Sequence, residues 1–440
     1  MQTVYFDNNA TTRTADEVRE SMLPFFGELY GNPSSMHAFG GGVSKHLSDA
    51  RERVAEFLNC SPDEVIFTSC ATESDNTAIR GTADWFGRDM KVITTAVEHP
   101  AVLRPARRLK AQGFTQVELS VNGIGQLDLD QLRAELKGTK NALVSVMWAN
   151  NETGNIFPIR EIAEIAKEHG AVMHTDAVQI AGKERIDVQQ VPVDMLAISG
   201  HKFHAPKGVG VLYVRKGTKI KPFMIGGHQE NGRRAGTENV PYIVGLAKAC
   251  ELAMTSFDEE AKTLGAMRDR LEAGILATCP DVRVNGDRAH RLPNTLNVSF
   301  EYIEGEAIAY HLSDLGICVS TGSACASGSH ALGEALRHMR HGDADVMIAG
   351  GGTTAYYLAE VLGKSGISVK IVEKDKERSR FLSLALPKAM IINADATVHE
   401  NLLEEGLSQM DAFVSLTTQD ETNIFLSLYA DKMAPKCKKI

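Results

Sequence analysis

The sequence has no apolar run that approaches the roughly 20 residues of a membrane-spanning helix, and it does not begin with a charged segment followed by an apolar one. Its seven cysteines include no Cys-x-x-Cys pair, which disfavours a zinc site or a disulfide framework. The formal net charge of -9, without a basic stripe, disfavours binding to nucleic acid or to an anionic membrane. We therefore expect a cytoplasmic protein with no metal site, no nucleic-acid partner and no membrane insertion.

The chain does contain enough apolar residues, 43% of 440, to build sizeable cores. Strand-like and helical patterns alternate along it, which indicates an α/β architecture. The length exceeds what one core usually serves, so we predict two or three domains.

Lys202 is the most informative residue, because it lies in Ser199-Gly-His-Lys-Phe-His-Ala-Pro-Lys-Gly208 after an apolar run. A lysine whose amine is kept neutral can hold an aldehyde cofactor as a Schiff base. Asp176 ends an apolar stretch and would project from the carboxyl end of a strand, where it would meet a pyridine nitrogen. Together the two residues suggest a pyridoxal phosphate (PLP) site. Taken singly, they fit a solvated loop lysine and a helix cap better.

Ala71 and Thr72 follow a strand-like segment and begin a helical pattern, so that backbone N–H groups and a hydroxyl can bind phosphate there. Alone, this motif is weak. Further motifs are Asp7-Asn-Asn-Ala-Thr-Thr12, Gly31-Asn-Pro-Ser-Ser35, Val97-Glu-His-Pro100, Met147-Trp-Ala-Asn-Asn-Glu-Thr-Gly154 and Arg233-Arg-Ala-Gly-Thr-Glu-Asn239. With these motifs, residues 1 to about 329 resemble the NifS-type cysteine desulfurases, in order and nearly without gaps.

This resemblance implies an α/β protein of PLP-dependent fold type I, similar to aspartate aminotransferase, that forms a homodimer. It implies that Lys202 binds PLP covalently, that Asp176 meets the pyridine nitrogen and that His99 stacks on the ring. Asn151 and Gln179 would lie near the ring oxygen. The residues that would hold the phosphate are Ala71, Thr72, Ser199, His201 and, from the neighbouring subunit, Thr237.

The segment Ser320-Thr-Gly-Ser-Ala-Cys-Ala-Ser-Gly-Ser329 consists of small residues, and its flexibility suits a moving thiol. By the resemblance, Cys325 attacks the sulfur of L-cysteine, becomes a persulfide and leaves alanine, and a sulfur acceptor or iron–sulfur scaffold protein takes the sulfur for cluster assembly. The attack needs a thiolate, so a low pKa would help. The alternative is that Cys325 is an inert small residue in a tight turn.

After residue 329 the resemblance to a desulfurase stops. The family's Arg-Phe-Ser-Leu-Gly-Arg string, whose first arginine holds the substrate carboxylate, is absent from the chain. Residues 324–351 instead resemble the nucleophile helix and following strand of a β-ketoacyl synthase. Loss of a bidentate arginine contact weakens cysteine capture about 10- to 100-fold, so we expect weak or absent sulfur release.

The segment Val346-Met-Ile-Ala-Gly-Gly-Gly-Thr-Thr-Ala355 is an apolar strand that runs into a G-x-G-x-x-A motif. Glu373 follows the glycines by about twenty residues, the position at which a Rossmann unit meets the adenosine ribose. Residues 346–440 resemble the nucleotide-binding domain of TrkA-type potassium-uptake regulators. This resemblance implies that Gly350, Gly352, Glu373 and Asp395 bind NAD or ATP.

The resemblances divide the chain into five parts. These are the N-terminal segment of the small domain (1–14), the PLP-binding large domain (15–257), a truncated small domain with the catalytic cysteine loop (258–329), a ketosynthase-like junction (330–345) and a Rossmann-like domain (346–440). No exposed polar linker separates the last parts, so we interpret the chain as a chimera.

The strand at 346–349 is needed both by an incomplete small domain and by the Rossmann unit. One strand cannot serve both, which predicts a frayed small domain or a weakened C-terminal domain. The expected function is that of a PLP-dependent cysteine desulfurase. The alternative is a nucleotide-binding regulator of potassium-transport type on a degenerate PLP scaffold.

Overall fold

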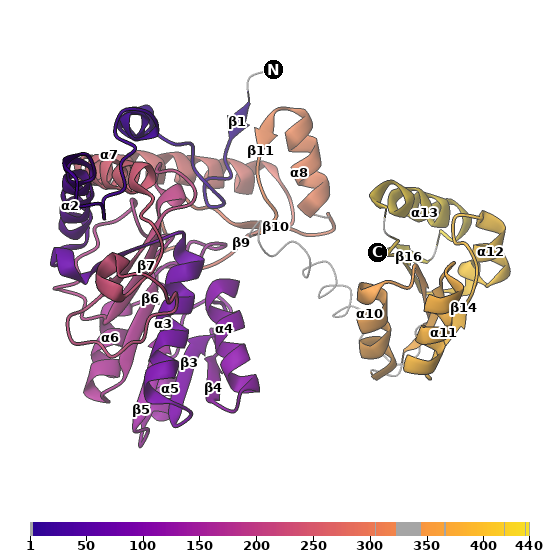
Figure 1. Ribbon diagram of the computed structural model, residues 1–440. Coiled ribbons are helices and arrows are strands. Elements are labelled where there is room, and N and C mark those ends of the chain that lie inside the picture. Colours follow the sequence, from indigo (N-terminus) through magenta and orange to yellow (C-terminus); the bar gives the residue numbers. More distant parts are fainter. Residues whose placement is uncertain are drawn as a thin grey trace. The chain divides into compact units, whose positions relative to one another are not determined.

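The computed structural model describes residues 3–303, 305–322, 345–364, 367–417, 419–435 and 437–439. The chain divides into two compact units, Met1–Ala324 and Cys325–Ile440, each with sheets and a core of its own (Figure 1). Within the described ranges, no helix combines the length and the apolar character that a bilayer crossing requires.

A seven-stranded sheet forms the centre of the first unit, with the order β2-β8-β7-β6-β5-β3-β4. Its strands are β2 (Val65–Thr68), β3 (Met90–Thr95), β4 (Thr115–Leu119), β5 (Asn141–Ser145), β6 (Val172–Asp176), β7 (Met195–Ser199) and β8 (Gly210–Val214). All neighbours are parallel except β8, which is antiparallel to both β2 and β7. The carboxyl ends of β2 and β7 therefore lie on either side of the start of β8.

Helices cover both faces of this sheet. They are α1 (Asp16–Met22), α2 (Ala38–Leu58), α3 (Ala71–Phe86), α4 (Pro100–Ala111), α5 (Leu129–Leu136), α6 (Ile159–Glu168) and α7 (Val240–Thr278), with short 3-10 helices η1 (Leu23–Phe26), η2 (Pro62–Glu64), η3 (Gly200–Lys202) and η4 (Gln229–Gly232). Successive residues of one strand enter different cores: Val92 packs with α3 and α4, whereas Ile93 packs with α2, α6 and α7. Burial on both faces explains why these strands are apolar along their whole length.

The small domain of the first unit has little described core. Strand β1 (Val4–Tyr5) pairs with β11 (Ile317–Cys318), and β9 (Val282–Val284) pairs with β10 (Val298–Phe300), so each sheet has two strands. Helix α8 (Gly305–Asp314) has no buried residue. Two-stranded sheets are marginal by themselves, and the truncation of the small domain stays a prediction.

The second unit contains a five-stranded parallel sheet with the order β14-β13-β12-β15-β16. Its elements are β12 (Asp345–Ala349), α10 (Thr353–Lys364), β13 (Ser368–Val372), α11 (Lys376–Ala385), β14 (Ala389–Ile392), α12 (His399–Glu404), η5 (Leu407–Gln409), β15 (Ala412–Ser415), α13 (Asp420–Met433) and β16 (Lys438–Lys439). Apolar clusters lie on both faces of the sheet. The central strand β12 contains residues 346–349, which we expected both the small domain and the Rossmann unit to need. In the structure this strand belongs to the Rossmann-like sheet.

Helix α7 runs without interruption through residue 257, at which we placed the end of the large domain. The division of the first unit into 1–14, 15–257 and 258–329 stays a prediction. Residues 330–344 of the expected junction lie outside the described residues.

Candidate active site

The expected site residues lie at the carboxyl edge of the seven-stranded sheet. Asp176 and Ser199 are the last residues of the neighbouring strands β6 and β7, and both are buried. The 3-10 helix η3 follows β7 at once and carries His201 and Lys202. Parallel strands bring their carboxyl ends to one edge, so the sheet itself places Asp176 beside the lysine loop.

The N-terminal segment runs directly along the lysine loop. Lys202 Nζ donates hydrogen bonds to the carbonyl oxygens of Asn9 and Ala10. The Nε2 of Gln179 donates to the same carbonyl of Asn9 at 3.0 Å. The backbone N–H of Thr12 donates to the carbonyl of His201 at 2.8 Å. The motif at residues 7–12 therefore shapes the floor of the site, a role that sequence reasoning did not assign to it.

His99 is the N-cap residue of α4, and its Nδ1 accepts a hydrogen bond from the backbone N–H of Ala101 at 3.1 Å. Burial and the nearby Lys202 lower the pKa of His99, although Asp176 opposes this shift. A neutral imidazole that accepts at Nδ1 carries its proton on Nε2. The structure thus defines both the charge and the tautomer of this ring.

Three of the expected residues act on one another electrostatically. Burial raises the pKa of Asp176, whereas His99, the N–H of Val178 and Lys202 lower it. Asp176 in turn raises the pKa of His99, and Lys202 lowers it. The structure therefore brings Asp176, His99 and Lys202 close enough to interact, although they are far apart in the sequence.

The start of α3 is an uncapped helix N-terminus. Its N-cap residue, Cys70, makes no side-chain cap hydrogen bond. Gly210, which pairs with both Thr68 and Ser199, allows the close approach, because a Cβ on Gly210 would lie 2.8 Å from the carbonyl carbon of Cys70. Exposed helical N–H groups in such a position attract anions.

Ala71 and Thr72 form the first turn of α3; Ala71 is buried and Thr72 is exposed. Ser199 and His201 approach from the end of β7, and burial together with Lys202 lowers the pKa of His201 to about 4. The structure thus places the four intrachain phosphate candidates around the start of β8.

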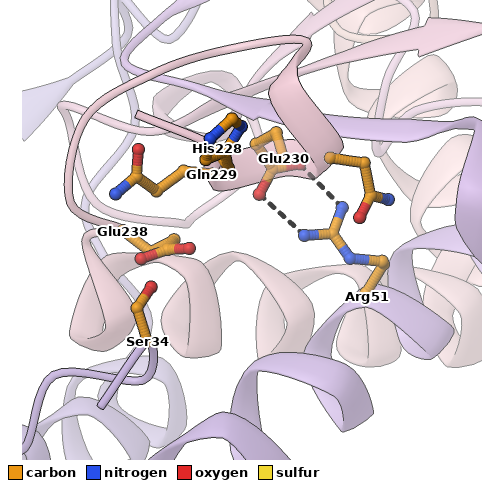
Figure 2. A pocket seen from close by; sticks show the side chains of 7 residues that line it. Ser34, Arg51, His228, Gln229, Glu230 and Glu238 are labelled. Atoms are coloured by element: carbon orange, nitrogen blue, oxygen red, sulfur yellow. Dashed lines mark hydrogen bonds and ion pairs between the residues drawn. The ribbon is translucent and has the colours of Figure 1, made fainter. Parts of the chain in front are cut away.

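Thr237 is exposed and lies in a loop that is fixed to α3 by Arg234. The same loop lines a polar cavity of about 420 Å³ (Figure 2). Arg51 and Glu230 form a two-bond ion pair in its wall, at 2.8 and 2.7 Å. None of the expected cofactor residues lines this cavity, so it is separate from the Lys202 site.

Asn151 is half-buried, and its carbonyl oxygen accepts a hydrogen bond from the Nδ2 of Asn9 at 3.3 Å. Cys325 lies outside the described residues. The last described part of its loop is tied to the N-terminal segment, because Ser320 Oγ donates to Asp7 Oδ1 at 2.8 Å. The start of the cysteine loop therefore contacts the same N-terminal segment that carries the hydrogen-bond partners of Lys202.

Sequence reasoning missed a buried polar cluster beneath the site. Asp75 and His174 are fully buried, with Oδ1 and Nε2 3.5 Å apart, and Nδ1 of His174 lies 2.8 Å from Ser145 Oγ. Burial lowers the pKa of His174 to about 3, and burial followed by Asp176 raises that of Asp75 far above its usual value. Burial thus disfavours the charged form of both side chains, and it acts in the same direction on Asp176.

In the second unit, Glu373 contacts the glycine loop. Oε2 of Glu373 accepts a hydrogen bond from the N–H of Gly351 at 2.6 Å. Gly350 has a φ of +101°, and a Cβ there would lie 2.5 Å from the carbonyl oxygen of Leu416. Gly352 is exposed at the start of α10, whereas Asp395 follows β14 and accepts from the N–H and Oγ1 of Thr397 at 2.9 and 2.7 Å.

Comparison with known proteins identifies both units. Residues 4–342 match the aminotransferase class-V family, and residues 346–440 match the TrkA-N domain. The chain is 54% identical to a cysteine desulfurase of Trichormus azollae over 339 residues, which are 77% of this chain and 84% of the relative. It is 52% identical to the cysteine desulfurase NifS of Azotobacter vinelandii over 340 residues, again 77% of this chain and 84% of the relative.

A solved NifS-like protein superposes with a TM-score of 0.71 at 43% identity, over 73% of this chain and 88% of that one. The expected fold, an aspartate aminotransferase-like large domain followed by a Rossmann-like domain, is confirmed. The class-V match extends to residue 342, into the stretch that resembles a β-ketoacyl synthase. The chain belongs to the class-V aminotransferase family and, within it, to the PLP-dependent cysteine desulfurases, and it carries a TrkA-N domain at its carboxyl end.

Proposed function

We propose that this chain converts L-cysteine to L-alanine and carries the released sulfur as a persulfide on Cys325. The observation that supports this most directly is the convergence of Lys202, Asp176 and His99 at one sheet edge. An acceptor or scaffold protein for iron–sulfur clusters would then take the sulfur. We propose that the working form is a homodimer in the cytoplasm, because Thr237 would complete the phosphate site of the other subunit.

The described residues fit a bound PLP. The buried Oε1 of Gln179 has no hydrogen-bond partner among them, and the first turn of α3 is uncapped beside Ser199. When bound, the cofactor supplies an electron sink for the substrate Cα. The residues proposed to hold it are Ala71, Thr72, His99, Asn151, Asp176, Gln179, Ser199, His201, Lys202 and Thr237.

Each of these residues has a task that follows from its surroundings. Asp176, buried at the carboxyl end of β6, would hold a proton on the pyridine nitrogen. His99 is neutral, so it can lie on an aromatic ring without the cost of a buried charge. Lys202, whose amine donates hydrogen bonds to two carbonyl oxygens, would bind the aldehyde and afterwards transfer protons to and from the substrate Cα.

The sulfur transfer itself belongs to Cys325. Its thiolate attacks the sulfur of L-cysteine, so that an S–S bond forms while the Cβ–S bond of the substrate breaks. The electron pair of that bond goes to Cβ, which takes up a proton and yields L-alanine. No external oxidant is needed, because the two electrons lost when the persulfide forms are taken up by Cβ of the substrate.

The test is an absorption spectrum of the full-length protein with added PLP, followed by L-cysteine and assays for alanine and persulfide. We expect an imine band that Lys202→Ala abolishes and that Lys207→Ala, an exposed lysine of the same loop, leaves intact. Cys325→Ser should keep the band and lose alanine formation. Alanine formation by Cys325→Ser at the wild-type rate would overturn the proposed role of Cys325.

A second candidate function rests on the contact between Glu373 and the glycine loop. We propose that Gly350, Gly352, Glu373 and Asp395 bind an adenine nucleotide, either NAD or ATP. If the protein binds a nucleotide but shows no imine band, the chain would be a nucleotide-binding regulator of potassium-transport type on a degenerate PLP scaffold. The unfolding temperature measured with NAD, NADH, ATP or ADP shows which nucleotide stabilises the protein. The variant Glu373→Gln should lose that stabilisation.

A further inference from the structure

Lys183 is a buried amine that no step of the proposed reaction uses. Its Nζ is buried and has no hydrogen-bond partner among the described residues. Burial followed by the nearby Lys202 lowers the pKa of Lys183 to about 7. An ammonium group buried without a partner is strongly unfavourable, so an amine in this place is easily deprotonated.

The backbone holds Lys183 against the lysine loop. Its N–H donates to the carbonyl of Ile180 at 3.0 Å, which closes a turn directly after Gln179. The preceding Gly182 has a φ of +74°, and a Cβ there would lie 2.2 Å from the Cβ of Phe203. Since Phe203 is the residue after Lys202, the turn that carries Lys183 and the loop that carries Lys202 are packed directly together.

The neighbouring charges come from several elements. Asp176 from β6, His99 from α4 and His201 from the lysine loop each interact electrostatically with Lys202. Lys207, from the same loop, acts on His201. Burial and then Lys202 lower the pKa of Lys183, and Lys183 in turn contributes to the lowered pKa of His201. Two ammonium groups in this place disfavour each other.

We propose that Lys183 is a positioning residue that takes the proton Lys202 must lose, so that the two amines share one positive charge near neutral pH. This inference rests on the proposed function of Lys202. Hydrogen bonds to the carbonyls of Asn9 and Ala10 favour the protonated form of Lys202. To attack an aldehyde, Lys202 Nζ needs a free electron pair and must lose a proton. That proton moves to Nζ of Lys183, which has no hydrogen-bond partner among the described residues. Two amines coupled in this way titrate as a pair.

The experiment measures the reactivity of Lys202 in the full-length protein without PLP. Trace acetic anhydride labels only neutral amines, and mass spectrometry compares Lys202 with the exposed Lys140 from pH 6 to about pH 10. We expect Lys183→Met to lower the labelling of Lys202 at pH 7 about tenfold, which corresponds to one pKa unit. Lys183→Arg keeps a permanent charge and should shift the titration of Lys202 to lower pH.

Opposite shifts by the two variants distinguish the shared charge from a packing role, since a packing defect would move both in one direction. Lys207→Met is the matched control, because Lys207 is an exposed lysine of the same loop, and its profile should equal that of the wild type. If Lys183→Met does not fold, Lys183→Gln carries the same expectation. A wild-type profile in Lys183→Met or Lys183→Gln overturns the proposal. Because no PLP is present, failure of the proposed enzymatic function does not affect this measurement.

A second readout uses the cofactor. Borohydride fixes PLP on Lys202, and the pH of half-maximal fixation should rise by about one unit in Lys183→Met. Fixation that is lost at every pH, together with an unchanged labelling profile, would point to a damaged cofactor site instead and would count against the proposal.

Discussion

Arg234 donates hydrogen bonds from Nε and Nη2 to the two carboxylate oxygens of Glu73, at 2.7 and 3.1 Å. Glu73 lies in the first turn of α3, and its Oε2 also accepts the N–H of Ser69 at 2.8 Å. Arg234 lies three residues before Thr237. The ion pair therefore fixes both the start of α3, where we propose that phosphate binds, and the loop proposed to reach the other subunit.

Removal of this pair should be costly, because the side chains of Arg234 and Glu73 are only 18% and 8% exposed. We expect Glu73→Ala to lower the free energy of unfolding by about 3 kcal/mol, since it leaves a largely buried guanidinium without its partner. Urea unfolding measures the difference, and PLP affinity should fall with it. Arg107→Ala is the matched control: the side chains of that bidentate pair with Glu118 are 56% and 25% exposed, and its loss should cost about 0–1 kcal/mol. Equal effects of the two variants would contradict the assignment.

Glu98 makes the stability of the first unit depend on pH. Its Oε1 accepts from Thr95 Oγ1 at 2.7 Å and from the N–H of Met147 at 3.0 Å. Burial, with a smaller contribution from Asp176, raises the pKa of Glu98 to about 8 despite these hydrogen bonds. A raised carboxyl pKa means that the folded state holds the proton more tightly than the unfolded chain does.

The contribution of Glu98 to stability is thus fully present below pH 4.5, its reference pKa, and is lost as the pH rises to about 8. In this range the free energy of unfolding should fall by up to about 1.4 kcal/mol per pH unit from Glu98 alone. Glu98→Gln keeps an acceptor for Thr95 and Met147 but cannot ionise, so its stability should be flatter with pH. Urea unfolding at several pH values measures both slopes. Identical slopes in the wild type and in Glu98→Gln would show that Glu98 does not titrate there.

The sequence was sufficient to predict which side chains lie at the carboxyl ends of strands. Asp176 and Ser199 follow apolar runs, and runs of that kind become parallel strands whose ends meet at one edge. The pairing of the glycine loop with Glu373 could be predicted for the same reason, because the β-α-β spacing fixes where the second strand ends.

Contacts that depend on the path of the whole chain could not be predicted. The hydrogen bond from Lys202 to Asn9 spans 193 residues, and no local pattern encodes it. Asp75 carries a carboxylate, a group that usually faces water, and only the packing of α3 against the sheet buries it completely. Lys183 likewise resembles a surface lysine of a polar turn until Gly182 is seen to pack against Phe203.

The absence of the family's arginine motif predicts weak substrate capture. The chain has the residues for the cofactor but no Arg-Phe-Ser-Leu-Gly-Arg string, and it spans 84% of its relative from Azotobacter vinelandii. We expect its apparent affinity for L-cysteine to be about 10- to 100-fold lower than that of this relative, while PLP affinity stays comparable. Spectral titration of both PLP-loaded proteins with L-cysteine measures the ratio. Equal affinities would mean that another group of this chain binds the carboxylate.

Two neighbouring glycines allow a sharp test of the glycine loop in the second unit. Gly350 has a φ of +101°, and a Cβ there would lie 2.5 Å from the carbonyl oxygen of Leu416, whereas a Cβ on Gly352 would have no heavy atom within 4 Å. Gly350→Ala combines a left-handed backbone with a clash against a strand end, so it should destabilise the second unit by at least about 2 kcal/mol. Gly352→Ala should leave the stability of this unit nearly unchanged, because it meets open space. Hydrogen exchange at β12 and β15 measures the stability of the second unit separately from that of the first. If the two variants exchange alike, then Leu416 does not approach the loop as closely as the structure shows, and the proposed nucleotide site loses its geometric basis.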